Sequence, residues 1–335
     1  MKYKFELPKI LFLLLVFILI TCKDSTNPIT PINNIHSKIL FSSNYQLQLI
    51  NIDGSEHQII PTAARFFGDA SLSPDGSKIV FESVDTTYQQ ISIYDLLTGE
   101  TIKVTEDNLF HESPRFSHNG KFIVYLTSLN RKDQIFIYNL ENDSTKQLTW
   151  DFYSYNPRFS PNDLQIIFNG NIGYADSVGI VIMDRDGTNI KLILDGEDPV
   201  FSPDGSKILY QDFIPPYSEG LYVMNVDGSQ KRFLSLIPFQ IQPNFSPDGS
   251  KIVFSNFTNN SDIFLINVDG SNLINLTNSP KTETFPVFSA DGSKIIYAQY
   301  DTTSHSNRLM SMNINGNEKK IIYEEISGFG MKIFN

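Results

Sequence analysis

Short apolar runs separated by turn residues make up most of this chain, and bulky apolar side chains occupy every second position within each run. The clearest example is residues 243–254, where two such runs flank Ser246-Pro247-Asp248-Gly249. Alternation of this kind, with β-branched residues, predicts strands, and the order Pro, Asp, Gly predicts a tight turn between them. The segment therefore predicts a β-hairpin.

The hairpin pattern returns along the chain with a nearly constant period. The serine before the turn lies 42 to 44 residues from its next copy, at Ser73, Ser117, Ser160, Ser202, Ser246 and Ser289. A second pair of apolar runs follows each hairpin, as at residues 263–277 around an Asp-Gly turn. A period in the low forties with four short strands is typical of a propeller blade. The sequence therefore predicts an all-β propeller of four-stranded antiparallel blades, as one domain rather than the two that length alone suggests.

Some copies of the turn depart from the pattern. Residues 117–120 lack the proline and the aspartate, and residues 160–164 lack the glycine. Proline presets φ for a turn, and glycine accepts the positive φ that follows it. We therefore expect less regular turns in these two blades.

The number of blades follows from counting both strands of the hairpin. The strand after the turn has seven copies, beginning at or near residues 38, 78, 121, 165, 207, 251 and 294, whereas the strand before it has only six clear copies. The repeat spacing places the missing aromatic residue at position 333 or 334, and Phe334 is present there. We predict seven blades, in which residues 331–334 complete the blade begun at Lys38 and close the ring, with six blades as the alternative.

The N-terminal segment has the pattern of an export signal. Lysines precede an unbroken apolar run at residues 10–20, which is too short to span a bilayer of about 30 Å. Residues 1–21 are therefore predicted to be a signal peptide. The sequence Leu19-Ile20-Thr21-Cys22 resembles the lipobox of bacterial lipoproteins. This resemblance implies that Cys22 is lipidated, and secretion without a lipid is the alternative.

The predicted organisation places the protein in the bacterial cell envelope. Residues 22–37 are mostly polar and contain two prolines, which predicts a flexible tether, and residues 38–335 form the propeller. The protein is expected to contact the outer membrane or the periplasmic side through its lipid anchor only. Its formal net charge of -11 argues against nucleic acid and anionic lipid headgroups as partners. The single cysteine excludes an intramolecular disulfide, so packing must hold the fold.

The repeated Phe-Ser-Pro-Asp-Gly-Ser-Lys motif carries a resemblance to a known family. Over residues 38–335 the chain resembles the TolB-type propellers and the wider set of WD-like propeller repeats. The resemblance implies a propeller that acts as a binding scaffold in the envelope. TolB-type proteins have an α/β domain before a six-bladed propeller, whereas this chain has the signal, Cys22 and the tether in that place.

Binding residues are expected at the end of the ring opposite the short Asp-Gly turns. The loops there are long, and loops held by a rigid scaffold commonly carry binding residues. Aromatic residues also precede the innermost strands, where they would suit a peptide or a sugar face. The predicted ligand contacts are Phe66, Phe67, Phe110, His111, Phe152, Tyr153, Tyr155, Phe239 and Phe285. The alternative is that these side chains fill the gaps between blades.

The sequence offers little for catalysis or metal binding. Its histidines lack metal-ligand spacing, and neither a Gly-x-Ser-x-Gly elbow nor a glycine-rich phosphate loop occurs. Asp75, Asp204, Asp248 and Asp291 lie in separate turns, which favours turn chemistry over calcium binding. No cofactor, metal or catalytic residue is predicted.

The predicted function is a membrane-tethered monomeric scaffold without enzymatic activity. Its expected partner is an envelope protein or peptide, such as a peptidoglycan-associated protein, or a cell-wall glycan. One alternative is a lyase or hydrolase acting on glycans, with His111 in its site, and another is a structural or sensory module.

Overall fold

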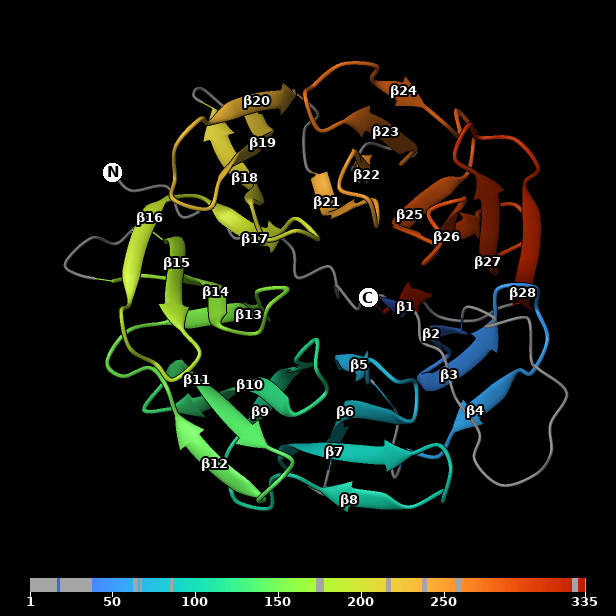
Figure 1. The fold of residues 1–335 in the computed structure, drawn as a ribbon. Coiled ribbons are helices and arrows are strands. Elements are labelled where there is room, and N and C mark those ends of the chain that lie inside the picture. The colour runs from blue at the N-terminus through green and yellow to red at the C-terminus, as the bar shows by residue number, and fades with distance from the viewer. Residues whose placement is uncertain are drawn as a thin grey trace, which may run out of the picture.

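The protein is a ring of antiparallel sheets around a common axis (Figure 1). The computed structural model describes residues 17–18, 38–62, 66, 68–84, 87–172, 178–214, 218–236, 240–256, 261–326 and 331–334. In these residues the regular elements are strands, and they form seven sheets. The predicted propeller of seven four-stranded blades is therefore confirmed.

Each blade runs outward from a short inner strand. Blade 1 contains β29 (Lys332–Ile333), β1 (Phe17–Ile18), β2 (Lys38–Ser43), β3 (Gln46–Asn51) and β4 (Gln58–Ile60). Blade 2 contains β5 (Ala70–Leu72), β6 (Lys78–Val84), β7 (Gln89–Asp95) and β8 (Thr101–Lys103). Blade 3 contains β9 (His111–Phe116), β10 (Phe122–Leu129), β11 (Lys132–Asn139) and β12 (Ser144–Gln147).

The remaining blades repeat this order. Blade 4 contains β13 (Ser154–Phe159), β14 (Gln165–Gly170), β15 (Gly179–Asp184) and β16 (Lys191–Asp195). Blade 5 contains β17 (Glu197–Phe201), β18 (Lys207–Ile214), β19 (Ser218–Asn225) and β20 (Arg232–Ser235). Blade 6 contains β21 (Gln240–Phe245), β22 (Lys251–Asn256), β23 (Ile263–Asn267) and β24 (Ile274–Asn275). Blade 7 contains β25 (Thr282–Phe288), β26 (Lys294–Asp301), β27 (Ser306–Asn313) and β28 (Lys320–Ile326).

The two ends of the repeat array meet in blade 1. β29 pairs antiparallel with β2, with Ile333 opposite Phe41, and the amide N–H of Phe334 donates a hydrogen bond to the carbonyl of Leu40 at 2.8 Å. The ring of Phe334 packs edge-on against Phe66 at 5.6 Å between centroids. The predicted closure by the C-terminal strand is therefore confirmed, and blade 7 lies beside blade 1 in Figure 1.

Part of the predicted signal peptide also pairs with blade 1. In β1, Phe17 and Ile18 lie opposite Leu40 and Ile39 of β2. Cleavage after Thr21 would remove this strand from the mature protein. The predicted lipidation residue Cys22 and the tether lie outside the described residues. No helix with the length and hydropathy needed to cross a bilayer occurs in the described part of the chain.

The core lies between the blades. Among the described residues, seven hydrophobic clusters are each shared by two neighbouring blades. The cluster between blades 4 and 5, for example, joins Ile167 to Ile208 and Tyr210, all of which are at most 1% exposed. Each blade therefore depends on both of its neighbours, and blade 1 packs against blade 7 through such a cluster as well.

Candidate binding site in the central channel

The inner strands are shaped by a β-bulge just before their last residues. The register of β9, β13, β17 and β25 shifts at this point, and the bulge residues Ser113, Asn156, Asp198 and Phe285 have φ between 50° and 56°. A proline follows each of them. Proline has no N–H for the sheet, so a bulge is one of the places that tolerate it. In these four blades the residue after the proline pairs again with the next strand, as Arg115 does with Val124 and Arg158 with Ile167.

The turns that follow the inner strands touch one another around the ring. A Cβ on Gly249 would lie 3.7 Å from Cδ of Pro203 in the preceding blade. The same approach occurs at four boundaries, which we call the Pro–Gly boundaries: Pro74–Gly120, Pro161–Gly205, Pro203–Gly249 and Pro247–Gly292. Each of these glycines has a φ near +70°, which glycine adopts without strain.

The aspartate of the regular turn is held by local hydrogen bonds. The Ser246 hydroxyl donates to Oδ1 of Asp248 at 2.5 Å, and the amide and hydroxyl of Ser250 donate to the same carboxylate. The Ser246 hydroxyl and the Ser250 groups lower the pKa of Asp248 to about 2. Turn chemistry thus accounts for this residue.

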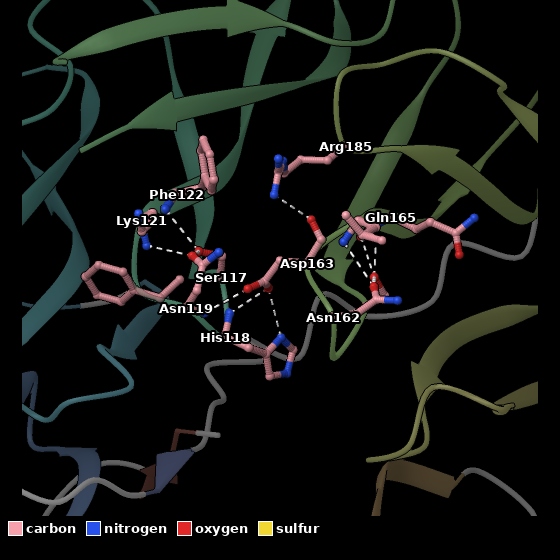
Figure 2. A network of polar contacts seen from close by, with 12 residues as sticks. Ser117, His118, Asn119, Lys121, Phe122, Asn162, Asp163, Gln165 and Arg185 are labelled. Atoms are coloured by element: carbon pink, nitrogen blue, oxygen red, sulfur yellow. Dashed lines mark hydrogen bonds and ion pairs between the residues drawn. The ribbon is translucent and has the colours of Figure 1, made fainter. Parts of the chain in front are cut away.

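Two turns that depart from the motif meet at one boundary, shown in Figure 2. His118 stands where four other turns have Pro74, Pro161, Pro203 and Pro247, and Asp163 of the next blade stands at the glycine position with a φ of 58°. The Asp163 carboxylate accepts hydrogen bonds from the backbone N–H groups of His118 and Asn119, both at 2.7 Å. His118 Nδ1 lies 3.2 Å from the same carboxylate.

The expected irregularity of these turns is not observed. Gly120 N–H donates to the Ser117 carbonyl at 3.0 Å, and Asp163 N–H donates to the Ser160 carbonyl at 2.8 Å, as in the regular turns. Asn119 accepts a hydrogen bond from Ser117 and so replaces the usual aspartate. The prediction was wrong because the missing proline frees a donor, and the acid at the glycine position supplies its acceptor.

This end of the channel contains a cavity of about 370 Å³. Inner strands of five blades, β5, β9, β13, β17 and β21, and the turns after β9, β13 and β17 form its wall. The lining residues are Ser71, Arg115, Phe116, His118, Arg158, Phe159, Pro161, Val200, Phe201, Ser202, Pro203, Asn244 and Phe245.

One column of the repeat supplies the cavity's varied chemistry. The residue before the inner-strand aromatic or leucine is Ser71, Arg115, Arg158, Val200 and Asn244 in successive blades. The residues after it are nearly the same in every copy. Sequence reasoning missed this site because it aligned the copies only at their nearly constant positions, the serine, the turn and the strand after it. Superposing the copies would have shown two arginines at the same position of consecutive repeats.

Arg115 is held by the neighbouring blade. Its Nη1 donates to the carbonyl of Ala70 at 3.3 Å, and its Nη2 lies 3.6 Å from Oδ2 of Asp69. Both side chains are mostly buried, at 17% and 15% exposure. Arg115 is therefore a positioned, neutralised cation in the wall.

Arg158 is placed differently, although it occupies the equivalent position. Within the described residues, no hydrogen bond or ion pair of its guanidinium is found. Burial, together with the positive charge of Arg115, lowers the pKa of Arg158 to about 10, so it stays protonated at neutral pH. The nearest acid on the next inner strand, Asp198, already accepts hydrogen bonds from Asn156 at 2.7 Å and Gln211 at 3.1 Å.

The aromatic residues predicted as ligand contacts fall into two groups. Phe66 and Phe285 are buried between blades, and Phe152 and Tyr155 pack against the cluster between blades 3 and 4. Phe110 and Tyr153 are 49% and 44% exposed. Among the described residues of this prediction, none lines the cavity, and binding at the aromatic end stays a prediction.

The other predicted site residues lie inside the protein or outside the description. His111 is 2% exposed, and its ring nitrogens contact Thr127 Oγ1 at 3.0 Å and Asp107 Oδ1 at 2.9 Å. Phe67 and Phe239 lie outside the described residues. No group of three or more His, Cys, Asp or Glu residues that could hold a metal occurs within the described ranges.

Comparison with known proteins places this geometry in context. Residues 30–176 and 173–328 match the family described as TolB beta propeller domain. The Tol-Pal system protein TolB of Francisella tularensis subsp. mediasiatica is 26% identical over 177 residues, which cover 50% of this chain and 40% of that protein. The chain thus matches less than half the length of that relative.

Solved structures support the fold. TolB from Acinetobacter baumannii has a TM-score of 0.56 and 21% identity, covering 71% of this chain and 63% of that one. An oligogalacturonate lyase in complex with manganese has a TM-score of 0.63 and 13% identity, covering 85% of this chain and 94% of that one. At these identities the likeness shows a shared propeller architecture, which hosts both kinds of protein.

Proposed function

The chain belongs to the TolB beta propeller domain family, and from this premise we propose that it is a binding scaffold of the bacterial cell envelope. In this proposal a lipid on Cys22 holds the propeller at a membrane, and the monomeric ring binds an envelope protein or peptide through the channel cavity. The long-loop end, with its exposed Phe110 and Tyr153, is a second contact surface for the same partner.

One observation carries the proposal: the variable column of the repeat converges on the cavity. A residue that only stabilises its blade has the same packing environment in every copy of the repeat. The aromatic and serine positions of the motif are accordingly almost constant. The column of Ser71, Arg115, Arg158, Val200 and Asn244 instead varies in polarity and charge around the ring, and it faces one shared space. A set of unlike polar groups around apolar walls suits an asymmetric ligand.

Site-specific photo-crosslinking in intact cells tests the proposal. A crosslinking residue at Asn244 lines the cavity, and one at the exposed Ile102 of the outer strand β8 is the matched control. We expect one discrete protein adduct from position 244 that position 102 does not give. The same adducts from both positions, or none from position 244, would argue against a channel partner. A crosslinker at Tyr153 shows whether the partner also covers the aromatic end.

Fractionation tests the membrane anchor. A Cys22→Ser variant should leave the membrane fraction, because the proposed attachment is the lipid alone. An unchanged membrane fraction would count against lipidation. Degradation of polysaccharides by the purified chain would replace the scaffold with the glycan-active enzyme as the favoured function.

A further inference from the structure

Arg158 has an unused capacity for hydrogen bonding. A guanidinium carries five N–H donors in a fixed plane, and none of them meets an acceptor among the residues that the structure describes. Arg115, one blade away, satisfies its donors on Ala70 and Asp69. The two arginines thus hold equivalent positions, but only Arg115 forms hydrogen bonds and an ion pair with described residues.

Such a cation is unfavourable unless something pairs with it. Arg158 is partly buried, and a charge partly removed from water loses hydration that an opposite charge or hydrogen bonds can replace. The neighbouring positive charge of Arg115 adds repulsion. The attraction of Asp198 and Asp69 offsets these penalties only in part, since the pKa of Arg158 is lowered overall, so a neutral side chain at position 158 would serve the fold better.

The charges around the cavity indicate which anion it accepts. Arg115 is paired with Asp69, whereas burial raises the pKa of Asp198 and so disfavours its negative charge beside Arg158. His118, which also lines the cavity, is directed to Asp163. Adding one negative charge beside Arg158 forms its missing pair, whereas a phosphate dianion would leave an excess of negative charge. The balance therefore favours a carboxylate.

The walls indicate what the carboxylate is attached to. Phe116, Phe159, Val200, Phe201 and Phe245 give the cavity apolar surface next to the arginines. Its volume of about 370 Å³ is near the lower end of the roughly 300–1,000 Å³ that ligand pockets usually have. The space fits a few side chains of a peptide better than a long ligand.

We propose that Arg158, positioned beside Arg115, is a carboxylate-binding residue that receives an acidic group of a partner peptide with apolar neighbours. The planar fork of the guanidinium forms two parallel hydrogen bonds with a carboxylate, a geometry that lysine cannot reproduce. Asn244 and Ser71 supply neutral polar groups in the same wall. This inference rests on the proposed channel-binding function and names the chemistry of its ligand.

Calorimetric titration of the full chain tests the inference. The probes are the peptide acetyl-Phe-Glu-Phe-amide, its counterpart with glutamine in place of glutamate, 3-phenylpropionate and inorganic phosphate. We expect the glutamate peptide to bind at least tenfold more tightly than the glutamine peptide and more tightly than phosphate. Arg158→Gln should abolish this tenfold preference, Arg158→Lys should retain part of it, and the exposed Arg232→Gln should leave it unchanged.

Several results would overturn the inference. These are equal affinity for the two peptides, a preference that survives Arg158→Gln, and no binding of either carboxylate probe. If 3-phenylpropionate binds as tightly as the glutamate peptide, the site takes small free acids and the peptide is the wrong source. A crosslinked partner at position 244 without carboxylate preference would reject this inference alone, whereas carboxylate binding without a partner would reject only the scaffold proposal.

Thermal unfolding without ligand provides an independent readout. Because Arg158 makes no hydrogen bond or ion pair with a described residue, Arg158→Gln should leave the melting temperature unchanged or raise it. A clear fall in the melting temperature would show that Arg158 supports the fold, and the assignment to a ligand would be lost. This measurement does not depend on the choice of probe.

Discussion

The four Pro–Gly boundaries and the single His118–Asp163 boundary join neighbouring blades by opposite means. At a Pro–Gly boundary, a ring without an N–H faces a residue without a side chain, and the contact is purely steric. At the other boundary, freed N–H groups meet a carboxylate whose side chain is only 4% exposed. The same geometry results from packing in one case and from charge-assisted hydrogen bonds in the other.

This difference shows that the proline and glycine of the motif are matched across the boundary between two blades, and not within a single turn. Losing the proline adds a backbone N–H group that needs an acceptor. Replacing the glycine adds a side chain that needs space at the boundary. Either change alone would be unfavourable. When both changes occur in adjacent blades, the new carboxylate accepts the hydrogen bond of the new N–H group.

The largest effect is expected from removing the carboxylate. Asp163→Ala leaves the N–H groups of His118 and Asn119 without their acceptor and places alanine at positive φ. The free energy of unfolding should fall by about 3 kcal/mol. Chemical denaturation followed by the fluorescence of Trp150, the single tryptophan, measures the change. Asp163→Asn is the matched control and should lose about 1 kcal/mol, and equal losses would contradict the role of the charge.

A somewhat smaller loss is expected when the acid is introduced at a Pro–Gly boundary. Gly249→Asp places a carboxylate beside Pro203, which has no N–H to donate. We expect a loss of about 2 kcal/mol in the same denaturation experiment, since the site is only half-buried. Gly249→Ala, which adds only the methyl group at the same φ, separates backbone strain from the charge. If Gly249→Asp left the free energy of unfolding unchanged, any boundary would accept either the Pro–Gly contact or the carboxylate.

Converting the unusual boundary to the regular one should restore stability. His118→Pro and Asp163→Gly should each lower the unfolding free energy by about 1–2 kcal/mol, because each leaves the other residue without its partner. The double variant should lie within about 1 kcal/mol of the natural protein, giving a coupling energy of about 1–3 kcal/mol. Strictly additive losses in this double-mutant cycle would mean that the two residues act independently.

The smallest effect concerns the aspartate inside a regular turn. Hydrogen bonds hold the pKa of Asp248 at about 2, below the ordinary value of about 3.9. Its contribution to stability is therefore present above pH 4 and is lost as the pH falls towards 2. Asp248→Asn should change stability by less than about 0.5 kcal/mol at neutral pH, since Asn119 accepts equivalent bonds in its own turn. The free energy of unfolding should fall less steeply with decreasing pH for this variant than for the natural protein. Identical pH profiles would refute a stabilising role of the ionised Asp248.

The fold was predictable because its signals are local and repeated. Alternating apolar residues and one turn motif define each hairpin, and the spacing to Phe334 was enough to predict the closure of blade 1. The binding cavity was not predictable from a single hairpin, since Arg115 and Arg158 become neighbours only when blades 3 and 4 pack side by side. Likewise, Phe66 and Phe110 precede equivalent strands, yet one packs between blades and the other is half exposed. Which of the two occurs depends on the facing blade.

The pairing of β2 with β29 fixes an order of events. β2 is synthesised before β3 to β28 and β29 after them, so the pairing of β29 with β2 cannot form until the other six blades have been synthesised. Closure of the ring therefore comes after the synthesis of all the other blades, and the pairing of β29 with β2 is the step that locks the native ring.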